Sequence, residues 1–64
     1  MITGTIKNWD GSKGWGFIIG DDGNDYFLHT SKIRIGQSVS INCRVKFDVS
    51  QGQRGPEAQN VTLY

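Results

Sequence analysis

The chain has 64 residues, enough for one small domain, and its one cysteine, Cys43, excludes an intrachain disulfide and suits the reducing cytoplasm. Seven basic and six acidic residues give a net charge of +1. This charge is too balanced to indicate nucleic-acid binding by itself. We expect a single domain over residues 1–64, without membrane association, because no secretory signal opens the chain and no apolar run approaches the roughly 20 residues that span a bilayer.

The first half of the chain alternates apolar and polar residues and predicts three strands, over 2–7, 14–19 and 25–29. Turn residues separate them, and the Asp-Gly pair at 22–23 tolerates the positive φ that a tight hairpin needs. Gly14 and Gly16 fall on the inward side of the second strand, where a missing side chain permits close backbone approach. Residues 30–32 predict one helical turn capped by a hydroxyl.

The second half contains the cleanest alternation, over residues 38–47, which predicts a long half-buried strand. Its inward positions are Val39, Ile41, Cys43, Val45 and Phe47. Residues 50–55 are expected to form a polar loop, and the last segment, 58–64, a strand that buries Val61 and Leu63. Five short strands, nine glycines and no long helix predict an all-β fold, a small barrel whose closure removes exposed sheet edges.

Aromatic residues gather on one side of the second and third strands. Trp15 and Phe17 share one face, and Phe27 and His29 share a face of the next strand, because successive side chains of a strand point to opposite sides. The inward side is already taken by Ile18, Tyr26 and Leu28. Leaving a large ring in water forgoes roughly 1.5–3 kcal/mol. We therefore expect these rings to lie open on the surface, where they can stack unpaired bases.

Other chemistry finds little support in the chain. The single histidine and the absence of ligand spacing argue against a metal site, and the acidic turn at 21–25 lacks the pattern of a calcium loop. No nucleophile–base pair and no phosphate-binding glycine loop is present, so we expect no enzyme activity, no cofactor and no small-molecule substrate. Lys7, Lys13 and Arg54 are either ordinary solvated charges or contacts to backbone phosphates.

The sequence resembles the cold-shock domain family, and bacterial cold-shock proteins in particular. Lys13–Ile18 follows the family's Lys-Gly-Phe-Gly-Phe-Ile motif, and Tyr26–Thr30 follows its Val-Phe-Val-His-Phe motif. Gly4–Lys7, Gly36–Val39 and Gly55–Val61 extend the likeness over essentially the whole chain. The resemblance implies a five-stranded antiparallel barrel of the oligonucleotide-binding (OB) type that binds single-stranded RNA or DNA, often as an RNA chaperone or a regulator of cold adaptation.

The resemblance also implies which residues contact nucleic acid. Base-stacking roles carry over to Trp15, Phe17, Phe27 and His29, with Trp9 at a family phenylalanine position, and backbone contacts carry over to Lys7, Lys13 and Arg54. The chain departs from the family at Asn8, where the family has a stacking tryptophan, and at Thr30, where it has a stacking phenylalanine. The segment after Ser31 is several residues shorter than usual.

One alternative stays open from the sequence. The same barrel could serve as a protein-interaction or self-association module with a reduced nucleic-acid face, because exposed aromatic patches also occur at protein interfaces. We expect a monomer, with weak dimerisation as the second possibility. The sequence leaves open the choice between RNA and DNA and the preference for particular bases.

Overall fold

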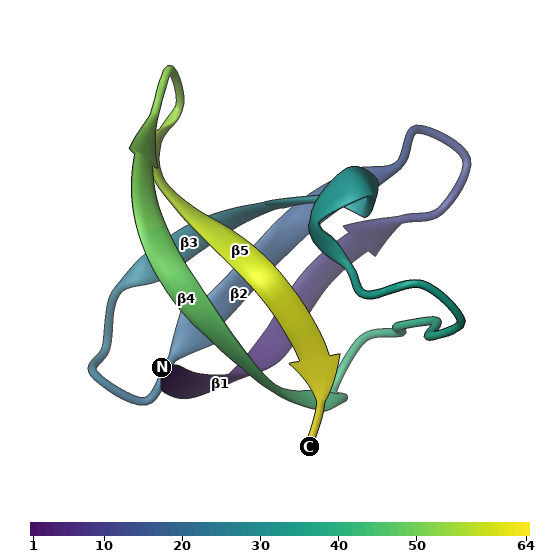
Figure 1. The fold of residues 1–64 in the computed structure, drawn as a ribbon, viewed down its shortest axis with the longest axis horizontal. Coiled ribbons are helices and arrows are strands. Elements are labelled where there is room, and N and C mark those ends of the chain that lie inside the picture. Colours follow the sequence, from purple (N-terminus) through teal and green to yellow (C-terminus); the bar gives the residue numbers. More distant parts are fainter.

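The computed structural model describes residues 1–64 and folds them into one closed barrel. Five strands follow the order β1-β2-β3-β5-β4 around the barrel, with a short 3-10 helix, η1, after β3 (Figure 1). Their bounds are β1 Ile2–Asp10, β2 Trp15–Gly20, β3 Asp25–His29, η1 Thr30–Lys32, β4 Arg44–Gly52 and β5 Gly55–Leu63. The predicted five-stranded all-β barrel is confirmed. Four pairings are antiparallel, while β3 and β5 close the barrel in parallel at Phe27 and Glu57.

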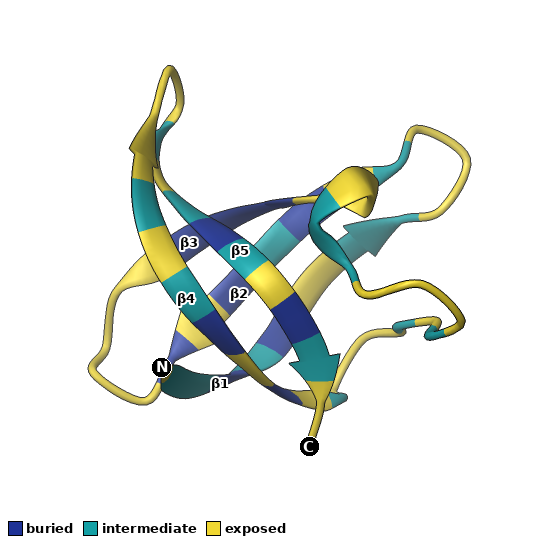
Figure 2. Cartoon of the chain, in the orientation of Figure 1, coloured by how far each residue is buried: buried dark blue, intermediate teal, exposed yellow.

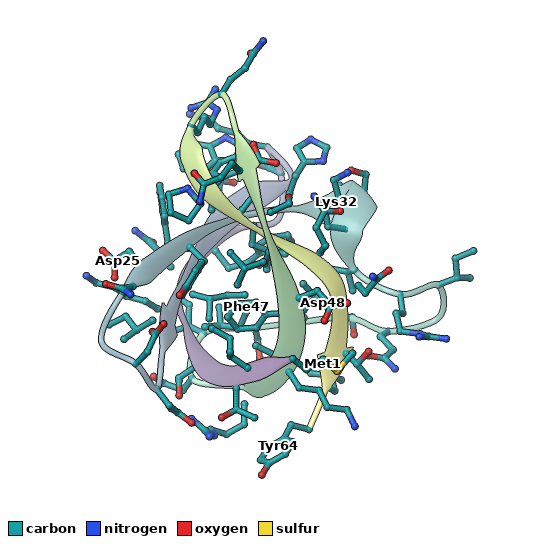
Figure 3. All side chains as sticks on the ribbon, turned by 60° about the vertical axis from the view of Figure 1, so that its left-hand side comes forward. Met1, Asp25, Lys32, Phe47, Asp48 and Tyr64 are labelled. Carbon is teal, nitrogen blue, oxygen red and sulfur yellow. The ribbon has the colours of Figure 1, made fainter.

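The core consists of side chains that alternate inward along the strands, as the dark bands in Figure 2 show. Phe47 is fully buried in the interior of the barrel, and the Tyr26 ring packs edge-on against it at 5.2 Å between centroids (Figure 3). Ile18, Tyr26 and Leu28 all belong to this core, so their predicted inward orientation is confirmed. Successive side chains of a strand point to opposite sides, so the residues of β2 that alternate with the buried ones face the outer surface.

A bulge in β1 changes which side chains face outward. Ile6 pairs with Ile18, but Asn8 pairs with Phe17, so Lys7 is an extra residue in the strand. The extra residue reverses the alternation, and Trp9 comes to lie opposite the buried Gly16. A Cβ atom at Gly16 would collide with the backbone carbonyl of Asn8. The close backbone approach expected at Gly16 is thus confirmed.

The long strand predicted over 38–47 is wrong in its first half, because β4 begins only at Arg44. Residues before it form a turn in which the Cys43 N–H donates to the Ser40 carbonyl, and Asn42 adopts a left-handed φ of 75°. Asparagine tolerates this region better than most residues, so a turn interrupts an alternation that looks continuous in sequence. Ile41 is consequently 52% exposed and not inward-facing.

The polar loop expected over 50–55 is wrong as well. Strand β4 continues to Gly52 and β5 starts at Gly55, so only the two residues Gln53 and Arg54 connect the strands. The hairpin tip projects beyond the barrel in Figure 1. Positive φ at Gly55 (94°) permits this tight reversal, and the hairpin brings Arg54 toward β3.

The end of β5 also departs from the prediction. Val61 is fully buried as expected, whereas Leu63 is 38% exposed. Leu63 occupies the last position of β5, where the strand ends and the side chain stays partly open to solvent.

Candidate nucleic-acid interface

The rings predicted to cluster do lie together on the outer side of β2 and β3. Phe17 pairs directly with Phe27, and Trp15 pairs with His29. Ring centroids are 6.2 Å apart for Trp15 and Phe17, 5.8 Å for Phe17 and Phe27, and 6.3 Å for Trp15 and Phe27. The first two pairs meet edge-on, and the third is stacked with an interplanar angle of 29°. We call Trp15, Phe17 and Phe27 the ring cluster.

The three rings differ in how far they are open to solvent. Trp15 is 36% exposed and Phe17 is half-buried, but Phe27 is only 8% exposed. The expectation that all three rings are open is therefore wrong for Phe27. Phe27 is not part of the buried core cluster, so its neighbours on the outer surface cover it. These neighbours include Trp15 and the guanidinium of Arg54, whose Cζ lies over the Phe27 ring at 5.0 Å from the centroid.

His29 is exposed at the end of β3, where its imidazole is held by the helix that follows. The ring Nδ1 accepts a hydrogen bond from the Ser31 backbone N–H at 3.1 Å and lies 2.9 Å from the Ser31 hydroxyl. The cap of η1 is thus an imidazole, and the predicted hydroxyl cap is wrong. This bond fixes the orientation of the His29 ring, and His29 itself pairs with Trp15 across the two strands.

Lys13 is exposed in an ordered turn that leads into Trp15. The Asp10 carboxylate accepts hydrogen bonds from the Ser12 hydroxyl at 2.7 Å, the Ser12 N–H at 3.1 Å and the Lys13 N–H at 3.2 Å. Hydrogen bonds to the Asp10 carboxylate hold its pKa below the usual range. The bond from the Ser12 hydroxyl has the larger effect, and the bond from the Lys13 N–H has the next largest. An ionised Asp10 therefore keeps folded the turn that carries Lys13, two residues before Trp15 of the ring cluster.

A small pocket opens beside Phe17, lined by Lys7, Asn8, Phe17 and Asp25. The Lys7 ammonium is 3.9 Å from an Asp25 carboxylate oxygen, and both side chains are more than half exposed, so their attraction is weak. Figure 3 shows Asp25 at the outer edge of the molecule. Asn8 was not expected as a site residue. It enters the site because of the β1 bulge, which the alternation of apolar and polar residues in the sequence does not reveal.

Among the predicted nucleic-acid contacts, Trp9 departs most from its expected position. Its indole is partly buried and packs against the core, opposite Gly16, on the inner side of β1. The bulge thus separates Trp9 from the outer face that Phe17 occupies. A contact between Trp9 and nucleic acid stays a prediction that its position does not favour.

No group of three or more His, Cys, Asp or Glu side chains is arranged to hold a metal ion. No helix has the length and hydrophobicity that crossing a bilayer requires.

Comparison with known proteins places the chain in a family. The model of the "'Cold-shock' DNA-binding domain" family matches residues 2–64. A cold shock protein of Arthrobacter globiformis is 44% identical over 98% of both chains. Cold shock protein 2 of Lactiplantibacillus plantarum is 43% identical over 95% of this chain and 96% of its own. The major cold shock protein of Streptococcus pyogenes is 42% identical over 97% and 96%.

A solved structure shows the same fold at lower sequence identity. The Drosophila Unr CSD456 structure superposes with a TM-score of 0.83 and 23% identity, and the match covers 98% of this chain and 26% of that one. The full-length family match and the bacterial relatives agree with the barrel and with the motifs around the ring cluster. The chain therefore belongs to the cold-shock domain family, a family of nucleic-acid-binding domains.

Proposed function

We propose that this protein binds single-stranded RNA or DNA by stacking unpaired bases on the outer face of β2 and β3. The stacking groups are the ring cluster and His29, and Lys7, Lys13 and Arg54 lie where they can meet the phosphate backbone. The observation that carries the proposal is the outward-facing ring cluster, with all three centroid separations at or below 6.3 Å. Rings so placed, outside the core and next to cations, suit base faces of any sequence.

The expected affinity is moderate. Each base–ring stack contributes roughly 1–3 kcal/mol, so the three groups that are not buried, Trp15, Phe17 and His29, give a gross gain of about 3–9 kcal/mol. Ordering a flexible strand removes part of this gain. A net near −7 to −9 kcal/mol, reached with the phosphate contacts, corresponds to a dissociation constant of about a micromolar. Neutralising two or three phosphates implies a slope near −2 for log K against log salt concentration.

These magnitudes favour a particular biological role. Weak, sequence-tolerant and fast-exchanging contact would keep RNA single-stranded without ATP, which is the work of an RNA chaperone. Duplexes should bind poorly because paired bases hide the faces that the rings require. We place this role in the cytoplasm, where a chain with one free cysteine stays reduced.

The test is a titration of fluorescently labelled single strands and duplexes, followed by anisotropy at several salt concentrations. We expect binding of single strands, much weaker binding of duplexes and a salt slope near −2. A slope steeper than about −5, or equal binding of duplexes, would show that charge dominates and would refute stacking. Concentration-dependent dimerisation without any oligonucleotide response would instead support the self-association alternative, and sedimentation of the free protein measures it.

A further inference from the structure

We propose that Arg54 is itself a stacking residue, whose guanidinium presents a platform to a base in place of the Phe27 ring beneath it. The proposal rests on the proposed function, since it concerns how the same surface receives a single strand. It also changes the role expected for Arg54, from a contact to backbone phosphate to a contact with a base.

The first observation is the covering of Phe27. Its side chain lies on the outer side of β3, yet it is only 8% exposed and does not belong to the core cluster. Arg54 lies over the ring at 5.0 Å and is itself exposed. A base that approaches this part of the ring cluster therefore meets the guanidinium before it meets the Phe27 ring.

The second observation is how firmly the backbone places Arg54. It belongs to the two-residue turn between β4 and β5, and Gly52 pairs with Gly55 directly below that turn. The parallel pairing of Phe27 with Glu57 holds β5 against β3, three residues after Arg54. Backbone pairing thus fixes the hairpin beside Phe27, and only the side chain of Arg54 has to span the remaining distance.

The third observation concerns the chemistry of the guanidinium. No carboxylate forms an ion pair with Arg54, so its charge is committed only to the aromatic ring. A guanidinium is planar and weakly hydrated, and it stacks on aromatic faces, whereas a lysine ammonium is a compact and strongly hydrated point charge. Arginine can therefore lie against Phe27 on one side and against a base on the other, in a way that lysine cannot.

This difference between arginine and lysine provides the test. Arg54→Lys keeps the positive charge and removes the plane, while Arg54→Ala removes both. If Arg54 stacks, both variants weaken binding of a labelled single strand by at least about 5-fold, the lower bound for one lost stack. Both variants retain the parent's salt slope because a stacking arginine neutralises no phosphate, whereas a phosphate contact would make Arg54→Ala lower the magnitude of the slope by about 0.7. If Arg54→Lys binds within 2-fold of the parent, Arg54 is only a phosphate contact and the proposal is overturned.

A second pair of measurements separates this proposal from the proposed function. Trp15→Ala removes the most open ring and leaves Arg54 in place. If Trp15→Ala weakens binding and Arg54→Lys does not, stacking on the barrel stands and the role of Arg54 falls. If neither variant weakens binding, both proposals fail. Thermal unfolding of each variant verifies that the barrel is intact, which is expected for Arg54 because its side chain is exposed in a turn.

Discussion

Replacement of Trp15 by alanine tests the proposed interface most directly. Trp15 is the most exposed member of the ring cluster, at 36%, and its indole contacts both other rings. Alanine removes the platform while leaving the backbone pairing with His29 in place. We expect the loss of one base stack, roughly 1–3 kcal/mol, which weakens binding between about 5-fold and 150-fold.

The same substitution has a cost for the fold that must be measured separately. Two aromatic contacts disappear, each worth about 0.5–1.5 kcal/mol, so the free energy of unfolding should fall by about 1–3 kcal/mol. For a domain of this size the total free energy of unfolding is roughly 5 kcal/mol. Removal of Trp15 also uncovers part of the Phe27 ring. A base can then stack on Phe27 instead, so we expect the loss of affinity to lie toward the lower end of the range from about 5-fold to about 150-fold.

The assay is anisotropy of a labelled single strand, which does not depend on tryptophan as the probe. Trp15→Phe is the matched control, because it keeps a ring at this position and should bind within about 3-fold of the parent, well below the loss of a full stack. Urea denaturation shows whether Trp15→Ala is folded under the assay conditions. If folded Trp15→Ala binds within 2-fold of the parent, the ring cluster is not the binding surface and the proposed function is refuted.

Three further predictions concern other parts of the barrel. Asn8→Trp adds a ring to the outer face beside the ring cluster and should tighten single-strand binding by about 5-fold or more, while Asn8→Ala should leave it unchanged. The Arg44 guanidinium donates a hydrogen bond of 2.8 Å to each Asp21 carboxylate oxygen and so holds the pKa of Asp21 well below its usual value. That stabilisation is present above the unfolded-state pKa of about 3.9 and is lost as the pH falls through the folded-state value. Urea denaturation at pH 7 and pH 3 should therefore show a smaller acid loss for Asp21→Asn than for the parent, and equal losses would contradict this reasoning. Gly16→Ala should lower the free energy of unfolding by about 1–3 kcal/mol because its Cβ meets the neighbouring backbone, whereas Gly11→Ala, with ordinary space around it, is the control that should change little.

The ring cluster could be predicted because its geometry is local. Trp15 and Phe17 are two residues apart on one strand, and a short turn brings Phe27 onto the same side of the next strand. The period of two in a strand and the Asp-Gly turn are both visible in the sequence. The position of Lys13 near the cluster is predictable for the same reason, since it lies two residues before the start of β2.

Positions that depend on irregular backbone could not be predicted in this way. The extra residue in β1 moves Asn8 to the outer face and Trp9 to the inner one, and periodicity alone does not reveal a one-residue bulge. The left-handed turn at Asn42 similarly interrupts an alternation that continues on both sides of it. The β1 bulge reverses the orientation of the residues that follow it, whereas the turn at Asn42 delays the start of β4 and leaves Val45 and Phe47 inward as expected.

The amino-acid order alone determined the strand character of this chain and the side of the β2–β3 hairpin on which the rings gather, because both follow from contacts between near neighbours. Tertiary structure alone decided that Phe27 is covered and that Arg54 covers it. That contact joins residues 27 positions apart, and it exists only because the barrel closes through the parallel pairing of β3 with β5. A pairing between distant strands leaves no periodic signal in either one, so the surface that a base meets is set by barrel closure.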